Sequence, residues 1–206
     1  MGYKQIDMPK VEEAVKNLLI ALGEDIDRSG LKETPHRVAK YWAELLEGED
    51  YTNEQIADMF RKDFKVSYDS MVIKECRNIY SVCEHHLAIM FNGTVYVAYI
   101  PEKHPDGDGY RVIGLSKIPR IVEMCSHRLQ LQEKLNEDIA DCISLATGSD
   151  RVYVRSIMDH SCVSARGAKS SGMTDVTYIS PRLRQDAEAR KEIEGKVQEL
   201  HLSSVR

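Results

Sequence analysis

The stretch Ser70–Pro101, SMVIKECRNIYSVCEHHLAIMFNGTVYVAYIP, decides how the rest of the chain folds. Its two outer runs, SMVIKECRNIYSV and GTVYVAYIP, are rich in β-branched and aromatic residues, which is typical of β-strands. The short loop between these runs contains Cys83, His85 and His86. We therefore expect two neighbouring strands, with a thiol and two imidazoles where the chain passes from one strand to the other.

Three segments before this stretch have the apolar spacing of amphipathic helices: PKVEEAVKNLLIALGED, ETPHRVAKYWAELLEG and TNEQIADMF. Gly23 is a natural end for the first helix. In the second segment, Thr34 is expected to cap the helix and Pro35 to take its first position. In the third segment, Thr52 and Gln55 have the spacing of a capping box.

The segments after this stretch continue with helices and return to strands. SKIPRIVEMCSHRL and LQEKLNEDIADCISLATG have helical spacing, RVYVRSIMDH and TDVTYIS are strand-like, and RQDAEARKEIEGKVQEL is a charged terminal helix. This order predicts an α+β fold, in which a pair of helices covers an antiparallel four-stranded sheet. The expected division is a helical segment over 1–66 and a sheet domain with a C-terminal helix over 67–206. The two open sheet edges favour pairing with other subunits.

The overall composition excludes several classes of protein. The 206 residues are 42% hydrophobic and 30% charged, which supports a packed core and argues against disorder. The net charge of -5 argues against a nucleic-acid partner, and no apolar run is long enough for a membrane helix. The first fifteen residues are polar and lack the apolar core of a signal peptide. With an odd number of cysteines, five, we expect a cytoplasmic protein with reduced thiols.

Thiols and imidazoles with metal-ligand spacing occur in two places. Cys83 and His86 lie three residues apart in a tight turn, and MDHSCVSARG adds His160 and Cys162 at the end of a predicted strand. Cys83, His86 and Cys162 would make an open Cys2His site, as in catalytic zinc centres. A closed structural site with His160 as fourth ligand fits the spacing equally well. The other three thiols are expected to be structural: Cys76, Cys125 and Cys142.

Six motifs occur in order between Thr34 and Gly167: ETPHRVAKYW, CEHH, VAYIP, VIGLSKIPRIV, RLQLQEKL and HSCVSARG. In this order and spacing they resemble the GTP cyclohydrolase I family. The resemblance implies the tunnelling fold, whose subunits join their sheets into pentameric barrels that stack into a decamer. Such an assembly would pair the open sheet edges. The segment after Gly167 resembles the family less closely than the motifs do.

The resemblance also assigns roles to the site residues. It implies a zinc ion bound by Cys83, His86 and Cys162. It leaves His85 and His160 free for proton transfer, near the ribose and at guanine N7 respectively. Ser116 resembles a serine that assists ring closure, although it could simply cap the helix that follows.

The remaining assignments concern substrate binding. Glu133 can accept the N1 and amino hydrogens of guanine through one carboxylate, and Gln132 resembles the neighbouring family contact. The basic residues that the resemblance assigns to the triphosphate are Lys117, Arg120, Arg166 and Arg37. Arg37 lies in the helical segment and would have to reach a neighbouring subunit.

The implied activity is zinc-dependent hydrolysis and rearrangement of GTP to 7,8-dihydroneopterin triphosphate and formate, the first step of pterin or folate-type biosynthesis. Two alternatives stay open at this point. One is a zinc-stabilised module that binds GTP or a pterin and regulates a partner protein. The other is an enzyme that stops at the ring-opened formamidopyrimidine.

Overall fold

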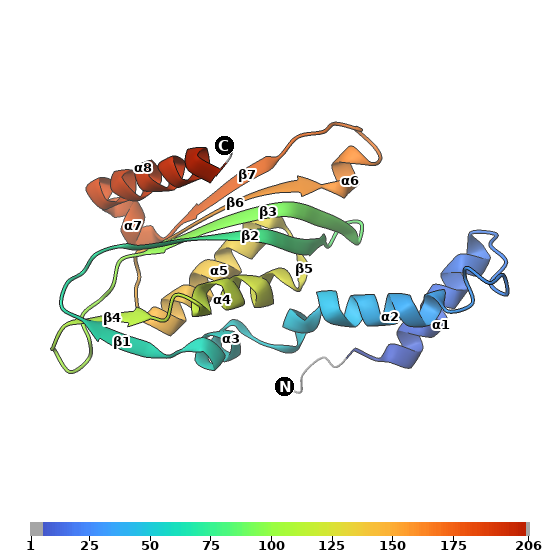
Figure 1. Cartoon of the computed structure of the whole chain (residues 1–206), viewed down its shortest axis with the longest axis horizontal. Coiled ribbons are helices and arrows are strands. Elements are labelled where there is room, and N and C mark those ends of the chain that lie inside the picture. Colours follow the sequence, from blue (N-terminus) through green and yellow to red (C-terminus); the bar gives the residue numbers. More distant parts are fainter. Residues whose placement is uncertain (1–5, 205–206) are drawn as a thin grey trace.

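The structure, a computed structural model, describes residues 6–204 (Figure 1). Its helices are α1 (Met8–Ala21), α2 (Thr34–Leu45), the 3-10 helix η1 (Glu47–Asp50), α3 (Asn53–Phe60), α4 (Lys117–Ser126), α5 (Gln132–Thr147), α6 (Ser161–Ser164), α7 (Pro181–Gln185) and α8 (Ala187–Ser204). Its strands are β1 (Asp63–Val66), β2 (Val72–Cys83), β3 (Ala88–Tyr99), β4 (Tyr110–Ile113), β5 (Leu129–Gln130), β6 (Val152–His160) and β7 (Thr174–Ile179).

The main sheet has the strand order β5-β2-β3-β6-β7. The pairs β2–β3, β3–β6 and β6–β7 are all antiparallel, which confirms the four-stranded antiparallel sheet expected from the sequence. The fifth strand, β5, is parallel to the end of β2 and has two residues. A run of two residues shows no periodicity, so the sequence could not reveal it. The strands β1 and β4 form a separate two-stranded ribbon.

Helices cover both faces of the main sheet (Figure 1). The larger core lies where α3, α4 and α5 pack on one face, and it includes Ile118, Ile121, Leu135 and Ile139. The smaller core lies between the other face and α8, and Tyr96 is at its centre. The predicted pair of covering helices is therefore α4 and α5, and α8 adds a layer on the opposite face.

Helix ends follow the sequence signals closely. The capping box is confirmed, because Thr52 accepts a hydrogen bond from the Gln55 amide and the Gln55 side chain accepts one from Thr52. The cap predicted for α2 is displaced by one residue: the helix includes Thr34, and Glu33 takes the capping position. The helix α5 ends at Gly148, whose φ of 75° lies in the left-handed region that favours glycine.

The helices α1 and α2 form a hairpin that extends away from the sheet (Figure 1). None of the α1 residues is buried. Their apolar side chains line a hollow of about 800 Å³ together with Val38 and Trp42 of α2. His86 and Leu87 line the same hollow, so the hairpin lies beside the loop that follows β2.

The α3 helix belongs to the helical segment by sequence, yet Ile56 and Ala57 are buried in the larger core. The division at residue 66 stays a prediction. In the part of the chain that the structure describes, no helix has the length and apolar character needed to cross a lipid bilayer.

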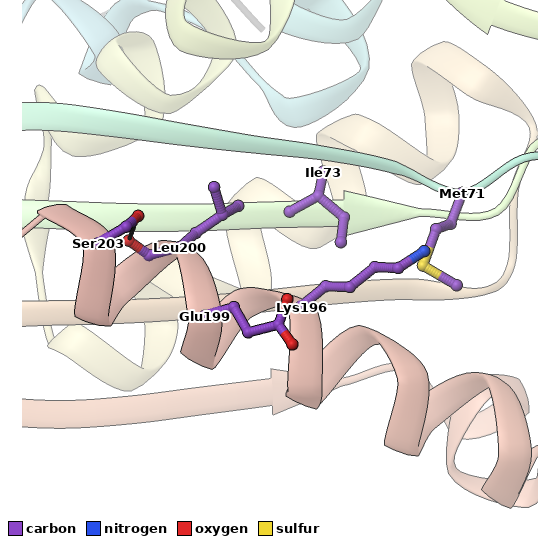
Figure 2. A pocket seen from close by; sticks show the side chains of 6 residues that line it. All are labelled: Met71, Ile73, Lys196, Glu199, Leu200 and Ser203. Carbon is purple, nitrogen blue, oxygen red and sulfur yellow. Dashed lines mark hydrogen bonds between the residues drawn. The ribbon is translucent and has the colours of Figure 1, made fainter.

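A groove of about 520 Å³ lies between α8 and the start of β2 (Figure 2). Met71 and Ile73 line it from the sheet side, and Lys196, Glu199 and Leu200 line it from the helix. None of the residues predicted to act chemically lines this groove. The functional site therefore has to be sought at the ends of the strands.

Candidate metal and substrate site

Strand register brings the two candidate ligand cysteines together. Cys83 ends β2 and pairs with Ala88, the first residue of β3. Further along β3, Met90 pairs with His160, the last residue of β6, and Cys162 follows in the next helical turn. Both cysteines therefore lie at the same end of the sheet, although 79 residues separate them in the sequence.

The ligand atoms of Cys83, His86 and Cys162 all lie within 4.8 Å of one another. The two Sγ atoms are 3.9 Å apart. Among residues 6–204, no other group of cysteine, histidine and acidic residues has this geometry. Two thiols and an imidazole suit a soft metal ion such as zinc, and three protein ligands leave the fourth position of a tetrahedral site open.

The protonation of Cys162 and the positive charge of Arg166 determine the electrostatics of the cluster. Burial and the neighbouring Cys83 thiol raise the pKa of Cys162, because two thiolates so close together would repel each other. A bound metal ion reverses this preference and holds both sulfurs as thiolates. Arg166 lies at the same place and donates a hydrogen bond to His86 Nε2 over 2.8 Å. The cluster therefore combines metal ligands with a fixed positive charge.

His85 is separated from the ligand group by the geometry of the turn. Its ring lies edge-on to that of His86, with the ring centroids 6.3 Å apart. The backbone at Leu87 is left-handed, with φ of 52°, and the Glu84 amide donates to the Gln130 carbonyl of β5. The turn thus exposes His85 beside the cluster without making it part of the cluster.

His160 stands next to the cluster but outside it. Its Nε2 lies 2.8 Å from Oε1 of Gln132, the first residue of α5. Burial lowers the pKa of His160, and the charges of Glu133 and Asp159 partly oppose this. Glu133, the residue after Gln132, is exposed in the first turn of α5. His160 lies outside the group of possible ligand atoms, and its ring contacts the Gln132 side chain.

Ser116 precedes α4, and Lys117 and Arg120 lie in its first turn, after β4. Pro119 of the same turn lines a hollow together with Asn78 and Tyr80 of β2. The backbone amide of Ile113 donates to the hydroxyl of Tyr99, at the far end of β3 from the cysteines. The twelve residues of β3 span about 36 Å, so the strand end beside Ile113 is far from the cysteines. Ser116, Lys117 and Arg120 are not in the group of possible ligands formed by Cys83, His86 and Cys162.

Ser116 takes the capping position of α4 but makes no side-chain hydrogen bond to the helix. The structure thus gives no support to a capping role for its hydroxyl. Arg37 donates to the carbonyl of Gly30 and to the hydroxyl of Thr34. Thr34 lines the same hollow as His86, but Arg37 is not among the residues that line it.

Sequence reasoning missed the hydrogen bonds that hold these residues in place. The Gln132 side chain is 2% exposed and contacts β6 and β7 as well as His160. Gln132 and His160 are 28 residues apart, and no spacing rule joins a helix start to a strand end at that distance. The Arg166–His86 bond, across 80 residues, had no sequence signal either.

The sheet order, the covering helix pair and the Cys–His–Cys cluster together define the class of protein: an α+β protein of the tunnelling-fold type with a candidate metal centre. The family model described as GTP cyclohydrolase I matches residues 11–198. The chain belongs to the GTP cyclohydrolase I family, and the expectation of an enzyme of this type is confirmed. The match also extends well beyond Gly167, where the motifs end.

Two relatives from Clostridium agree with this assignment. A GTP cyclohydrolase 1 of Clostridium acetobutylicum is 44% identical over 187 residues, which cover 88% of this chain and 92% of the relative. A GTP cyclohydrolase 1 of Clostridium botulinum is 43% identical over 181 residues, which cover 84% of this chain and 87% of the relative. Among solved structures, an archaeosine synthase QueF-Like in the apo form covers 54% of this chain and 95% of its own, with a TM-score of 0.38 and 19% identity.

Proposed function

We propose that this chain converts GTP to 7,8-dihydroneopterin triphosphate and formate. The observation that carries the proposal is the open Cys–His–Cys cluster with His160 beside it, in a member of this family. A closed site of four protein ligands would have favoured a regulatory binding module instead.

The metal ion in this proposal is zinc, bound by Cys83, His86 and Cys162. The donor set supports zinc, since thiolates and imidazole are its preferred protein ligands. When bound, zinc lowers the pKa of a water molecule and so supplies a nucleophile for guanine C8 at neutral pH. The exposed side of the cluster, at His86, gives the substrate access to it.

Two histidines carry the proton transfers. His160 gives a proton to guanine N7 as the nucleophile adds, and its partly buried position beside the cluster supports this role. His85 is exposed in the loop after β2 and serves as the acid for opening the ribose. Each histidine is held by a different element, so each can face a different part of one substrate.

Recognition of guanine falls to Glu133. Its carboxylate is exposed in the first turn of α5, where it can accept the N1 and amino hydrogens of guanine. Adenine has no hydrogen on N1, so the same carboxylate discriminates against it. Gln132, the residue before it, is buried and contacts His160.

The triphosphate is bound by Arg166 at the cluster end of one chain and by Lys117, Arg120 and Arg37 of neighbouring copies. The length of β3 supports the contribution of a second copy, because α4 follows a strand that begins beside the far end of β3 from the cysteines. Ser116 would reach the substrate from the same neighbour as Lys117 and Arg120. The proposed assembly is a homodecamer of two pentamers, in which open sheet edges pair. We propose a cytoplasmic location, where the thiols stay reduced.

The direct test is to incubate the zinc-loaded protein with GTP and to measure formate together with the fluorescent pterin formed after oxidation. Both products are expected in equal amounts, and metal analysis should give one zinc per chain. Formate without pterin, with a formamidopyrimidine identified by mass spectrometry, would limit the activity to ring opening. GTP binding without either product would leave a binding module and contradict the proposal.

A further inference from the structure

The side chain of Gln132 joins three elements at the site. Its Nε2 lies 3.0 Å from the Ser156 carbonyl oxygen of β6 and 3.0 Å from the Thr174 carbonyl oxygen of β7. The Ser156 hydroxyl is also 3.0 Å from Nε2. On its other side, Oε1 lies 2.8 Å from His160 Nε2. The side chain is 2% exposed, so water does not compete for these bonds.

These contacts determine which way the amide of Gln132 faces. A carbonyl oxygen can only accept a hydrogen bond, so the two carbonyls of Ser156 and Thr174 require the amide nitrogen on their side. The reverse orientation would place Oε1 against two carbonyl oxygens in a buried place, so acceptors would face each other with no hydrogen between them. The amide oxygen therefore faces His160, and an oxygen of this kind can only accept.

We propose that Gln132 is a positioning residue that fixes His160 with a permanent hydrogen on Nε2. In the neutral ring, Nδ1 then carries the lone pair, so Nδ1 is the atom that exchanges a proton with the substrate. The proposal rests on the proposed function, since it names the atom through which His160 acts. In this proposal Gln132 orients the imidazole of His160, as carboxylates and carbonyls orient histidines in other catalytic sites.

The chain offers a matched control one helical turn away. Asn136 is fully buried on α5, and its Nδ2 donates to the Val176 carbonyl of β7 over 2.9 Å. It thus ties α5 to β7 as Gln132 does, but the structure records no hydrogen bond from it to His160. A substitution at Asn136 removes a buried side-chain hydrogen bond to β7 but leaves the hydrogen bond of His160 in place.

The experiment uses zinc-loaded protein with ¹⁵N-labelled histidines, at a pH where the imidazoles are neutral. The resonances of His160 are assigned by their absence from the spectrum of His160→Asn. In the unchanged protein, Nε2 should carry the hydrogen and Nδ1 should have the shift of an unprotonated nitrogen. In Gln132→Met, which keeps the length of the side chain, both tautomers should be populated.

The kinetic part compares Gln132→Met with Asn136→Leu. For Gln132→Met we expect kcat to fall about 10- to 100-fold, whereas KM changes by less than about 3-fold and the zinc content stays unchanged. Asn136→Leu should lower the unfolding temperature but keep the Nε2–H tautomer and a kcat within about 3-fold of the unchanged protein.

The outcomes separate this proposal from the proposed function. A hydrogen on Nδ1 in the unchanged protein would overturn the proposal, and this measurement does not depend on whether Gln132→Met folds. An unchanged kcat in a folded Gln132→Met would overturn it as well. Failure of the unchanged protein to release formate from GTP would instead contradict the proposed function, whichever tautomer the spectrum gives.

Discussion

Two pairs of cysteines lie almost equally close in this molecule, yet only one pair belongs to the candidate metal site. The Sγ atoms of Cys83 and Cys162 are 3.9 Å apart at the end of the sheet. Those of Cys125 and Cys142 are 3.6 Å apart between α4 and α5. Sulfur–sulfur distance alone therefore does not distinguish a metal site from a packed core.

The surroundings of each pair make the difference. Cys125 and Cys142 are completely buried in the larger core, outside the ligand group that His86 completes. The adjacent Cys142 thiol and burial hold the pKa of Cys125 far above its usual range, so the Cys125 thiol stays protonated. The pair Cys83 and Cys162 has the imidazole of His86 beside it, which can serve as the third ligand of a metal ion. His86 is exposed, so a metal ion can reach the pair from solvent.

The largest expected effect comes from removing a thiol of the site pair. In Cys162→Ser, zinc affinity should fall about 100- to 1000-fold, because binding energies of zinc sites divide among only three or four ligands. Metal content after dialysis and formate release from GTP would measure it. A Cys162→Ser protein that keeps one zinc per chain would remove the basis for separating the two pairs.

Replacement of His160 tests whether the metal ion has three protein ligands or four. His160→Ala should keep its zinc and lose about 100-fold or more in the rate of ring opening, because a positioned acid is lost and no ligand is. Metal analysis and single-turnover formate release provide the two readouts. Loss of zinc from a folded His160→Ala protein would instead make His160 a fourth ligand.

A substitution in the core pair, Cys125 and Cys142, should lower the stability of the fold without changing metal binding. Cys142→Ala removes a buried sulfur and leaves a small cavity, so we expect about 1 to 2 kcal/mol less stability. Urea unfolding would measure this cost, and metal analysis should give the same zinc content as in the unchanged protein. Zinc loss without unfolding would show that the two pairs are coupled.

The smallest effect concerns pH. Burial raises the pKa of Cys76, another core thiol, from 9.0 to about 11. The higher pKa belongs to the folded state. The Cys76 thiol therefore stabilises the folded protein fully at pH values below its ordinary pKa, and this stabilisation is lost as the pH rises toward the pKa of the folded state. At pH 9.5 the loss is about 0.8 kcal/mol.

Urea unfolding of metal-free protein at pH 7 and pH 9.5 would measure the alkaline loss of stability. Cys76→Ala should lose less stability over this interval than the unchanged protein does. An equal or greater loss in the variant would mean that the core thiol ionises as freely as an exposed one.

Much of the fold and of the metal cluster could be predicted from local patterns. The strands around the cluster, the Thr52 capping box and the core position of Cys125 all depend on short spacings. The two-residue strand β5 was missed because it is too short for a pattern. The Gln132–His160 bond was missed because it depends on how α5 lies against β6. The distance of Ile113 from the cysteines depends on the length of β3, which motif order does not contain.

The length of β3 also determines what a solitary folded chain is able to do. Under the proposed assembly, each chain alone carries two half-sites, one at the cluster and one at the start of α4, and no complete site. Under the proposed function, Cys162→Ser and Arg120→Ala would each be inactive alone, because every copy lacks the same half. Oligomers that contain both variants would have some subunit interfaces where two intact half-sites meet. These interfaces would regain catalytic activity. Activity regained by mixing the two variants, and lost again on dilution, would measure association of the chains. Such a measurement is independent of whether each chain folds.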